Sequence, residues 1–372
     1  MDVNLREGCG ATVGHQYKGM GEGRGISHGV RVYDRCETMT RPPSGQARAA
    51  VIVAGPTCSG KSALALALAR QVNGTIINTD SMQVYRDLRI LTARPDATEE
   101  ACVPHALYGV LPAAESGSVA WWRTQAIAAA HDAWDAGRVP VFCGGTGMYF
   151  RALTDGLADI PQPPDSIRAQ ARDMVGRLGP RAVHDMLRQH DPETAATLRP
   201  TDGQRIARAW EVREATGHGL VWWRREAVLP PLDAHFVAIR LHPPRDALRA
   251  AIARRFHAML DHGAMAEVAR LLAQDLSPTL PAMRAHGVPE LAAVLRGDMD
   301  MAEAAQQAIR MTGQYTKRQA TWFAHHALAA EVDTFLYEKR FEKCDDAQQM
   351  ERCGKKIISF VIKRIDAGQG FP

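Results

Sequence analysis

Short apolar runs alternate with helical patterns over the first part of the chain. The run from Ala50 to Ala54 is partly β-branched and ends at Gly55-Pro56, which predicts a buried strand that enters a turn. The same reading along the chain predicts strands at 50–54, 75–79 and 139–143, and helices at 62–71 and 119–136. Strands that alternate with helices predict a parallel sheet with helices on its faces.

The pattern changes near Asp165, and most of the chain from there to Ala324 is helical in spacing. One apolar run, 235–241, predicts a further strand. The stretch 165–270 holds 17 Arg and no Lys, against 13 Asp and Glu. Guanidinium groups suit phosphate and base recognition, but a genomic codon bias toward Arg would produce the same excess. The Arg count alone leaves both explanations open.

Composition narrows the class of protein only slightly. Of the 372 residues, 46% are hydrophobic and 23% charged, as in ordinary globular proteins, and the net charge of +4 permits a nucleic-acid partner without requiring one. No apolar run reaches the length of a membrane span, so we expect no membrane partner. The seven cysteines form no CxxC pair or metal-ligand spacing, which favours a reducing cytoplasm. Cys58 and Cys143 lie beside glycine-rich turns and are either buried or reactive.

One motif carries specific chemistry. Gly55-Pro56-Thr57-Cys58-Ser59-Gly60-Lys61-Ser62 fits the phosphate-loop pattern G-x-x-x-x-G-K-[ST], between a predicted strand and a predicted helix. Backbone N–H groups and the helix N-terminus attract an anion there. Lys61 supplies a charge for the terminal phosphate, and the Ser62 hydroxyl is placed to bind Mg²⁺. The motif predicts a bound di- or triphosphate without saying which.

Two further features follow strand ends. Asp80 ends the second predicted strand, and the carboxyl ends of parallel strands line one crevice, so Asp80 should lie near the phosphate loop. A carboxylate there binds metal or takes a proton, although it equally caps a following helix. A second glycine-rich turn, 144–147, follows the third strand and should face the same crevice.

Several motifs in this order resemble the bacterial tRNA dimethylallyltransferases, also called tRNA isopentenyltransferases. The motifs are 55–62, Asp80-Ser81-Met82-Gln83-Val84-Tyr85, Thr92-Ala93-Arg94-Pro95, Pro104-His105, Gly144-Gly145-Thr146-Gly147-Met148-Tyr149, Asp202-Gly203-Gln204-Arg205-Ile206-Ala207-Arg208-Ala209-Trp210-Glu211-Val212 and Tyr315-Thr316-Lys317-Arg318-Gln319-Ala320-Thr321-Trp322-Phe323. The resemblance runs from about Val51 to Ala324. It departs from the family at Val288-Pro289, where an aromatic residue and its neighbour are usual.

The resemblance implies a reaction. It implies transfer of a dimethylallyl group from dimethylallyl diphosphate to N6 of adenosine 37, in tRNAs that read codons beginning with U. It makes Asp80 the general base and places Thr57 on the bridging oxygen of the diphosphate. Lys61, Arg255 and Ser62 with Mg²⁺ would neutralise the leaving group. The whole loop 55–62 would hold the donor.

The resemblance also implies a path for the tRNA anticodon stem-loop, whose target base must be flipped out of its stack. The implied tRNA-binding residues are Asp80, Ser81, Met82, Gln83, Thr146, Arg168, Gln204, Arg205, Ile206, Ala207, Arg208, Arg284, Ala285, His286, Gly287, Val288, Pro289, Lys317, Arg318, Gln319, Ala320, Thr321, Trp322, Phe323 and Ala324. Arg205 and Arg208 share one helix face by their spacing, while Ile206 should turn to the core.

The expected fold is an α/β protein with a P-loop NTPase-like parallel sheet core and a mostly helical insertion domain. We expect a disordered N-terminal extension at 1–48, the first part of the core at 49–164, a tRNA-binding helical insertion at 165–234, the second part of the core with C-terminal helices at 235–331, and a tail without an assigned role at 332–372. We also expect a monomer.

Three other functions share parts of these features. A P-loop small-molecule kinase has the loop and the sheet but does not need the Arg-rich insertion. An isopentenyltransferase that acts on free adenine nucleotide would leave that insertion idle. A noncatalytic RNA-binding protein would not need Lys61, Ser62 and Asp80 together.

Overall fold

The computed structural model describes residues 48–341 and 347–368. The predicted N-terminal extension lies outside the described residues except for Arg48. Among the described residues, no helix is long and apolar enough to cross a membrane.

A six-stranded sheet forms the centre of the described chain, and all of its strand pairs are parallel. Its order is β3 (His105–Ala106), β2 (Gly74–Asn78), β4 (Val139–Gly144), β1 (Ala49–Ala54), β7 (His235–Leu241) and β8 (Thr334–Tyr337). The four strands predicted from apolar runs are confirmed as β1, β2, β4 and β7. The short edge strands β3 and β8 were not predicted, because two to four residues are too few to show a pattern.

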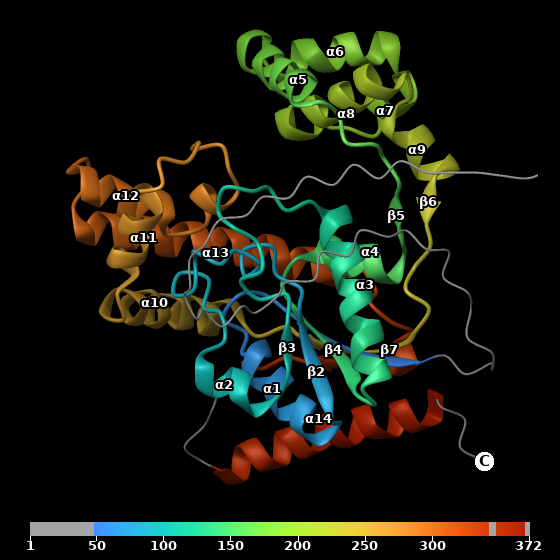
Figure 1. Ribbon diagram of the computed structural model, residues 1–372, viewed down its shortest axis with the longest axis vertical. Coiled ribbons are helices and arrows are strands. Elements are labelled where there is room, and N and C mark those ends of the chain that lie inside the picture. Colours follow the sequence, from blue (N-terminus) through green and yellow to red (C-terminus); the bar gives the residue numbers. More distant parts are fainter. Residues whose placement is uncertain (1–47, 342–346, 369–372) are drawn as a thin grey trace, which may run out of the picture. The chain divides into compact units, whose positions relative to one another are not determined.

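Helices cover both faces of the sheet (Figure 1). The alternating residues of β1 separate the two cores: Val51 and Val53 pack with α1 (Lys61–Gln71) and α14 (Ala347–Gly368), whereas Ile52 packs with α3 (Val119–Asp135). A strand buried on both faces reads as a continuous apolar run, as this one does. The predicted helices at 62–71 and 119–136 are confirmed within one residue as α1 and α3.

The helices that follow β7 pack beside the core that contains α3. They are α10 (Arg245–Asp261), α11 (Ala264–Leu272), η1 (Ala282–Arg284), α12 (Val288–Arg296) and α13 (Met301–His325), and η2 (Glu331–Asp333) precedes β8. Two shorter helices, α2 (Ala97–Cys102) and α4 (Gly147–Thr154), lie earlier in the chain.

A separate group of helices occupies the stretch predicted as the insertion. Its members are α5 (Asp165–Leu178), α6 (Pro180–His190), α7 (Pro192–Ala196), α8 (Gly203–Thr216) and α9 (Leu220–Glu226). The chain enters and leaves this group through β5 (Leu157–Ala158) and β6 (Val228–Leu229), which pair antiparallel (Figure 1). The group has a small core of its own, with Leu187, Ala209 and Val212 at its centre.

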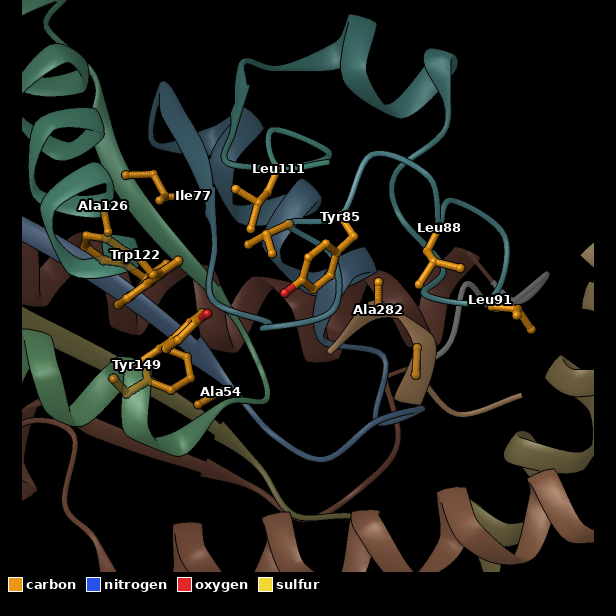
Figure 2. Close-up of a cluster of buried hydrophobic side chains, with 14 of the residues drawn as sticks. Ala54, Ile77, Tyr85, Leu88, Leu91, Leu111, Trp122, Ala126, Tyr149 and Ala282 are labelled. Carbon is orange, nitrogen blue, oxygen red and sulfur yellow. The ribbon is translucent and has the colours of Figure 1, made fainter. Parts of the chain in front are cut away.

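Large aromatic side chains support the strand ends from one side. The Trp122 indole stacks on the Tyr149 ring with their centroids 4.0 Å apart. Figure 2 shows the two side chains next to each other. The Trp122 Nε1–H donates to the main-chain oxygen of Asn78, at 2.9 Å. The buried indole therefore both fills the core and fixes the end of β2, the strand that precedes Asp80.

Candidate active site at the carboxyl ends of the strands

The predicted phosphate loop joins β1 to α1. Gly60 has a φ of 90°, in the left-handed region, and α1 begins at the next residue. No side chain of the described residues caps the first turn of α1. The N–H groups of that turn are therefore available to an anion, which is the property that phosphate loops use.

A cavity of about 400 Å³ lies beside the loop. Its charged lining residues are Lys61, Arg254, Arg255 and Arg340; Cys58, Gly60, Ser62, Ala63, Ala251 and Ala258 complete the wall. All the charged groups are cations, contributed by three separate segments of the chain. The cavity is therefore suited to a compact polyanion such as a diphosphate.

A second cavity of about 70 Å³ shares Arg255 with the first. Apolar side chains make up much of its wall: Met82, Leu91, Ile252, Phe256, Met259 and Ala285. Thr57 of the phosphate loop and Asp80 also line it, with Thr92, His286, Thr312 and Tyr315. Three residues to which the resemblance gave roles in one reaction thus line one small space: Thr57, Asp80 and Arg255.

Asp80 is held in position by a turn at the end of β2. The Asp80 carboxylate accepts a hydrogen bond from the Met82 N–H, at 2.9 Å. The buried Asn78 accepts from the Asp80 N–H at 2.9 Å, and its amide donates to the main-chain oxygens of Asp80 and Leu107. Sequence analysis passed over Asn78, whose side chain fixes the main chain around the proposed base.

Two phenols and one imidazole lie near Asp80. Burial, and then the Asp80 charge, raises the pKa of Tyr315 to about 12 and raises that of Tyr149. Both phenols therefore keep their proton at neutral pH and well above it. Burial is the largest cause that lowers the pKa of His286, whose ring lies 5.2 Å from that of Tyr315. A neutral imidazole beside the carboxylate suits contact with an uncharged base.

Gln319 connects the phosphate loop to the second glycine-rich turn. Its Oε1 accepts from the Thr57 N–H at 2.9 Å, and its Nε2 donates to the Gly145 oxygen at 2.8 Å. The side chain is 5% exposed. A Cβ at Gly145 would collide with the Gln319 amide, and one at Gly144 would collide with the main chain of Thr79. Gly144 is therefore required by the close approach of the Thr79 main chain, and a side chain at Gly145 would displace the hydrogen-bonded Gln319 amide.

The proposed tRNA-binding residues divide by exposure. Those with exposed or partly exposed side chains are Asp80, Ser81, Met82, Gln83, Thr146, Arg168, Gln204, Arg205, Arg208, Arg284, His286, Pro289, Lys317, Arg318, Ala320, Thr321, Trp322 and Ala324. Buried are Ile206, Ala207, Ala285, Gly287, Val288, Gln319 and Phe323. The buried set can serve RNA binding only by positioning its neighbours, and Ile206 lies in the core as its helical spacing predicted.

Three arginines of the insertion carry acidic neighbours. Arg168 pairs with Asp165, Arg205 lies 3.4 Å from Asp202, and Arg208 lies 2.7 Å from Glu211. In each pair the two residues are three positions apart in the chain. An ion pair in which both side chains are exposed contributes little to stability. A phosphate group can compete for Arg168 and Arg205 at small cost, whereas release of Arg208 would leave the buried Glu211 carboxylate unpaired.

Sequence analysis missed several cationic residues. Arg254 and Arg340 line the cationic cavity beside the phosphate loop, which we call the phosphate cavity. Burial lowers the pKa of Arg224, and the nearby charges of Arg151 and Arg205 lower it further. These three arginines form a second basic cluster, with one residue each from α4, α8 and α9. Their spacing in the sequence gives no sign that they lie near one another.

Cys58 and Cys143, the two cysteines beside glycine-rich turns, are both buried. Burial raises the pKa of Cys143 to about 12. The structure therefore favours the reading of small buried residues over that of reactive thiols. Among the described residues, no group of three or more His, Cys, Asp or Glu side chains is arranged to hold a metal ion.

Known proteins resemble this chain over most of its length. The sequence model of the IPP transferase family matches residues 83–326, and that of the isopentenyl transferase family matches 48–103. The tRNA dimethylallyltransferase of Gluconacetobacter diazotrophicus is 61% identical over 90% of this chain and 100% of its own length. That of Gluconobacter oxydans is 56% identical over 88% of this chain and 98% of its own length.

Solved structures agree with the fold. The tRNA isopentenylpyrophosphate transferase of Bacillus halodurans has a TM-score of 0.60 and 29% identity, over 87% of this chain and 100% of the other. A eukaryotic dimethylallyltransferase has a TM-score of 0.69 over 84% of this chain and 80% of the other, and its 24% identity bears on the fold alone. The predicted class, a P-loop-like parallel sheet core with many helices, is confirmed. Together with the family match over residues 83–326, the close relatives show that this chain belongs to the tRNA dimethylallyltransferase (IPP transferase) family.

Proposed function

We propose that this protein transfers a dimethylallyl group from dimethylallyl diphosphate to N6 of adenosine 37 in tRNAs that read codons beginning with U. One observation carries the proposal. Arg255 lines both the cationic cavity and the small, largely apolar one, and Thr57 and Asp80 line the latter. A diphosphate and a five-carbon allylic chain need two such spaces in contact, whereas a nucleoside triphosphate does not need the apolar one.

The donor binds with its diphosphate in the cationic cavity and its allylic carbons against Met82, Leu91 and Ile252. Thr57 lines the small cavity and precedes Cys58, which lines the cationic one, and its hydroxyl would donate to the bridging oxygen. As the bond between the allylic carbon and that oxygen breaks, negative charge grows on the diphosphate. Lys61, Arg255 and the loop N–H groups stabilise that charge, an effect worth about 3–4 kcal/mol for each donor removed.

Asp80 acts as the general base. The exocyclic N6 of adenosine attacks the allylic carbon and forms the new C–N bond, and the Asp80 carboxylate accepts the N6 proton while diphosphate departs. The proton goes to Oδ2 of the carboxylate, because Oδ1 accepts a hydrogen bond from the Met82 N–H. An exocyclic amine is a poor nucleophile, and a positioned base contributes about 10²–10⁴-fold to such steps.

Mg²⁺ suits the donor set available here. This ion keeps several waters and binds through substrate phosphates and one or two hard oxygen ligands. Ser62, an exposed residue at the first turn of α1 that lines the cationic cavity, offers a hydroxyl as such a ligand. When bound, Mg²⁺ would neutralise part of the charge on the diphosphate. Ser62 would hold it there beside Lys61.

The tRNA binds to the proposed tRNA-binding residues whose side chains are exposed or partly exposed, and its adenosine 37 extends to Asp80. The helical stretch 165–234 would grip the anticodon stem-loop through phosphate contacts, with the cluster of Arg151, Arg205 and Arg224 as one anchor. We propose that the remaining stretches, 49–164 and 235–331, form the catalytic core, and that the protein acts in the cytoplasm as a monomer.

Transfer of labelled dimethylallyl diphosphate tests the proposal. The acceptors are unmodified tRNA with A36-A37, the same tRNA with A37 replaced by G, and AMP, each with and without Mg²⁺. Label on the A37 tRNA alone, dependent on Mg²⁺, is expected. Label on AMP would make the protein a free-nucleotide transferase. ATP turnover without any label would make it a P-loop kinase.

The variant Asp80→Asn tests the base in the same assay. It keeps the shape and the acceptor for the Met82 N–H but is too weak a base to take the proton. We expect the transfer rate at saturating substrates to fall by about 10²–10⁴-fold, with tRNA affinity within about twofold of the unaltered protein. An equal loss of rate and of tRNA affinity would make Asp80 a recognition residue instead.

A further inference from the structure

We propose that Arg340, from the segment that follows β8, is a binding residue for the diphosphate of the donor, an inference that rests on the function proposed above. Both family sequence matches end before this residue, at 103 and 326. Sequence analysis assigned no role to the segment 332–372. In the structure, Arg340 forms part of the wall of the phosphate cavity, together with Lys61 and Arg255.

The segment reaches the phosphate loop through two hydrogen bonds. The Arg340 Nε–H donates to the main-chain oxygen of Cys58, at 2.8 Å. The Phe341 N–H donates to the oxygen of Ser59, at 2.9 Å. The main-chain oxygens of two consecutive loop residues thus accept hydrogen bonds from this segment. Cys58 has a φ of 67°, a conformation that costs free energy for a non-glycine residue and that its partners stabilise.

The fit between the segment and the loop is close. A Cβ on Gly60 would collide with the Phe341 carbonyl, so the glycine of the motif serves this contact as well as the turn. Phe341 is 4% exposed and packs in the core that contains Leu64 and Ile357. Because the Phe341 ring is buried, the main chain of the neighbouring Arg340 is held at the cavity wall. The hydrogen bond from its Nε–H to Cys58 then positions the guanidinium group.

The geometry explains why an arginine stands here. Its Nε–H donates to the Cys58 carbonyl, and the same planar group, which forms part of the cavity wall, carries two further nitrogens. A lysine has a single nitrogen and cannot bind the carbonyl and a phosphate through separate groups. The diphosphate would therefore contact cationic side chains from α1, from α10 and from the segment after β8.

Affinity for inorganic pyrophosphate tests the inference. The variants are Arg340→Gln, Arg340→Lys and the matched control Lys339→Gln, whose side chain is exposed and does not line the cavity. Titration calorimetry with Mg²⁺ and pyrophosphate, without tRNA, gives the dissociation constant. The KM for dimethylallyl diphosphate at saturating tRNA is measured alongside, and thermal melting reports the fold.

Arg340→Gln is expected to raise both the dissociation constant and the KM by about 10- to 100-fold, and Lys339→Gln by less than about twofold. Arg340→Lys separates binding from loop support, because it keeps the charge and loses the Nε donor. Partial recovery by lysine supports phosphate binding. Equal loss in the lysine and glutamine variants, or unchanged affinity in the glutamine variant, would overturn the proposal.

A chemical measurement on the unaltered protein covers the case in which Arg340→Gln does not fold. Phenylglyoxal modifies accessible arginines, and peptide mass analysis reports the extent at each site. Pyrophosphate should protect both Arg340 and Arg255, and protection of Arg255 alone would refute the role of Arg340. Because this measurement needs no transfer reaction, it stays decisive even if the unaltered protein transfers no dimethylallyl group, which would refute the proposed function alone.

Discussion

Replacing Gln319 by Met tests whether this side chain positions the phosphate loop or contacts RNA. Methionine has nearly the same length and volume but neither accepts from the Thr57 N–H nor donates to the Gly145 oxygen. The resemblance placed Gln319 among the tRNA-binding residues, whereas its 5% exposure leaves no surface for an RNA base. The two roles predict different kinetic effects.

The magnitude follows from the two hydrogen bonds. Each unsatisfied buried partner costs about 1–3 kcal/mol, so the free energy of unfolding should fall by about 2–6 kcal/mol. Without its bond to Gln319, the Thr57 main chain can shift relative to the donor. A displacement of about 1 Å at a reacting centre costs about 10²-fold in rate. We expect kcat to fall by about that factor, with the dissociation constant for tRNA unchanged within about twofold.

The assay measures kcat at saturating tRNA and donor, tRNA affinity by filter binding, and stability by urea denaturation. Lys317→Ala is the matched control, because this exposed residue lies on the same helix and is also a proposed tRNA-binding residue. It should weaken tRNA binding and leave kcat unchanged. If Gln319→Met weakens tRNA binding as much as Lys317→Ala does and leaves kcat intact, the positioning role is wrong.

Three further predictions concern buried polar groups. The Glu267 carboxylate accepts three main-chain N–H groups of segment 89–91, at 2.8–2.9 Å; Glu267→Ala should lower the free energy of unfolding by about 3–5 kcal/mol, and a loss under about 1 kcal/mol in urea denaturation would contradict this. The pKa of Tyr315 is raised to about 12, so the folded state holds this proton above pH 10 while the unfolded state releases it. Its contribution to stability is thus complete below about pH 10 and is lost as the pH rises toward 12, and Tyr315→Phe should flatten that decline in the urea midpoint. At pH 8, a thiol reagent followed by peptide mass analysis should modify the exposed Cys102 and spare the buried Cys143; equal modification would mean that the strand end opens in solution.

The strands, the phosphate loop and the place of Asp80 could be predicted because each depends on local pattern plus one general rule. A continuous apolar run marks a strand buried on both faces, and a glycine-rich turn after it marks an anion site. The parallel order then brings every strand end to one edge. For this reason Thr57 and Asp80, 23 positions apart in the chain, were expected together, and they line one cavity.

Long-range contacts could not be predicted in the same way. Gln319 on α13 holds Thr57, Glu267 on α11 holds segment 89–91, and Arg340 after β8 reaches Cys58. Each partner lies 176 to 282 residues from the residue it binds. A side chain that serves a distant main-chain group has no periodic signature, because its spacing depends on how whole elements pack.

The pattern of residues by itself thus determined the class of fold and the anion-binding loop, while the proposed roles of Asp80, Thr57 and Arg255 came from the resemblance to a family. Hydrophobic periodicity and turn chemistry are properties of neighbouring residues, so they can be read without a structure. Only the tertiary structure decided which of the many arginines meet at the phosphate cavity and which proposed RNA contacts are buried. It also decided that the segment after β8 supports the loop, because burial and charge proximity exist only once distant segments have packed.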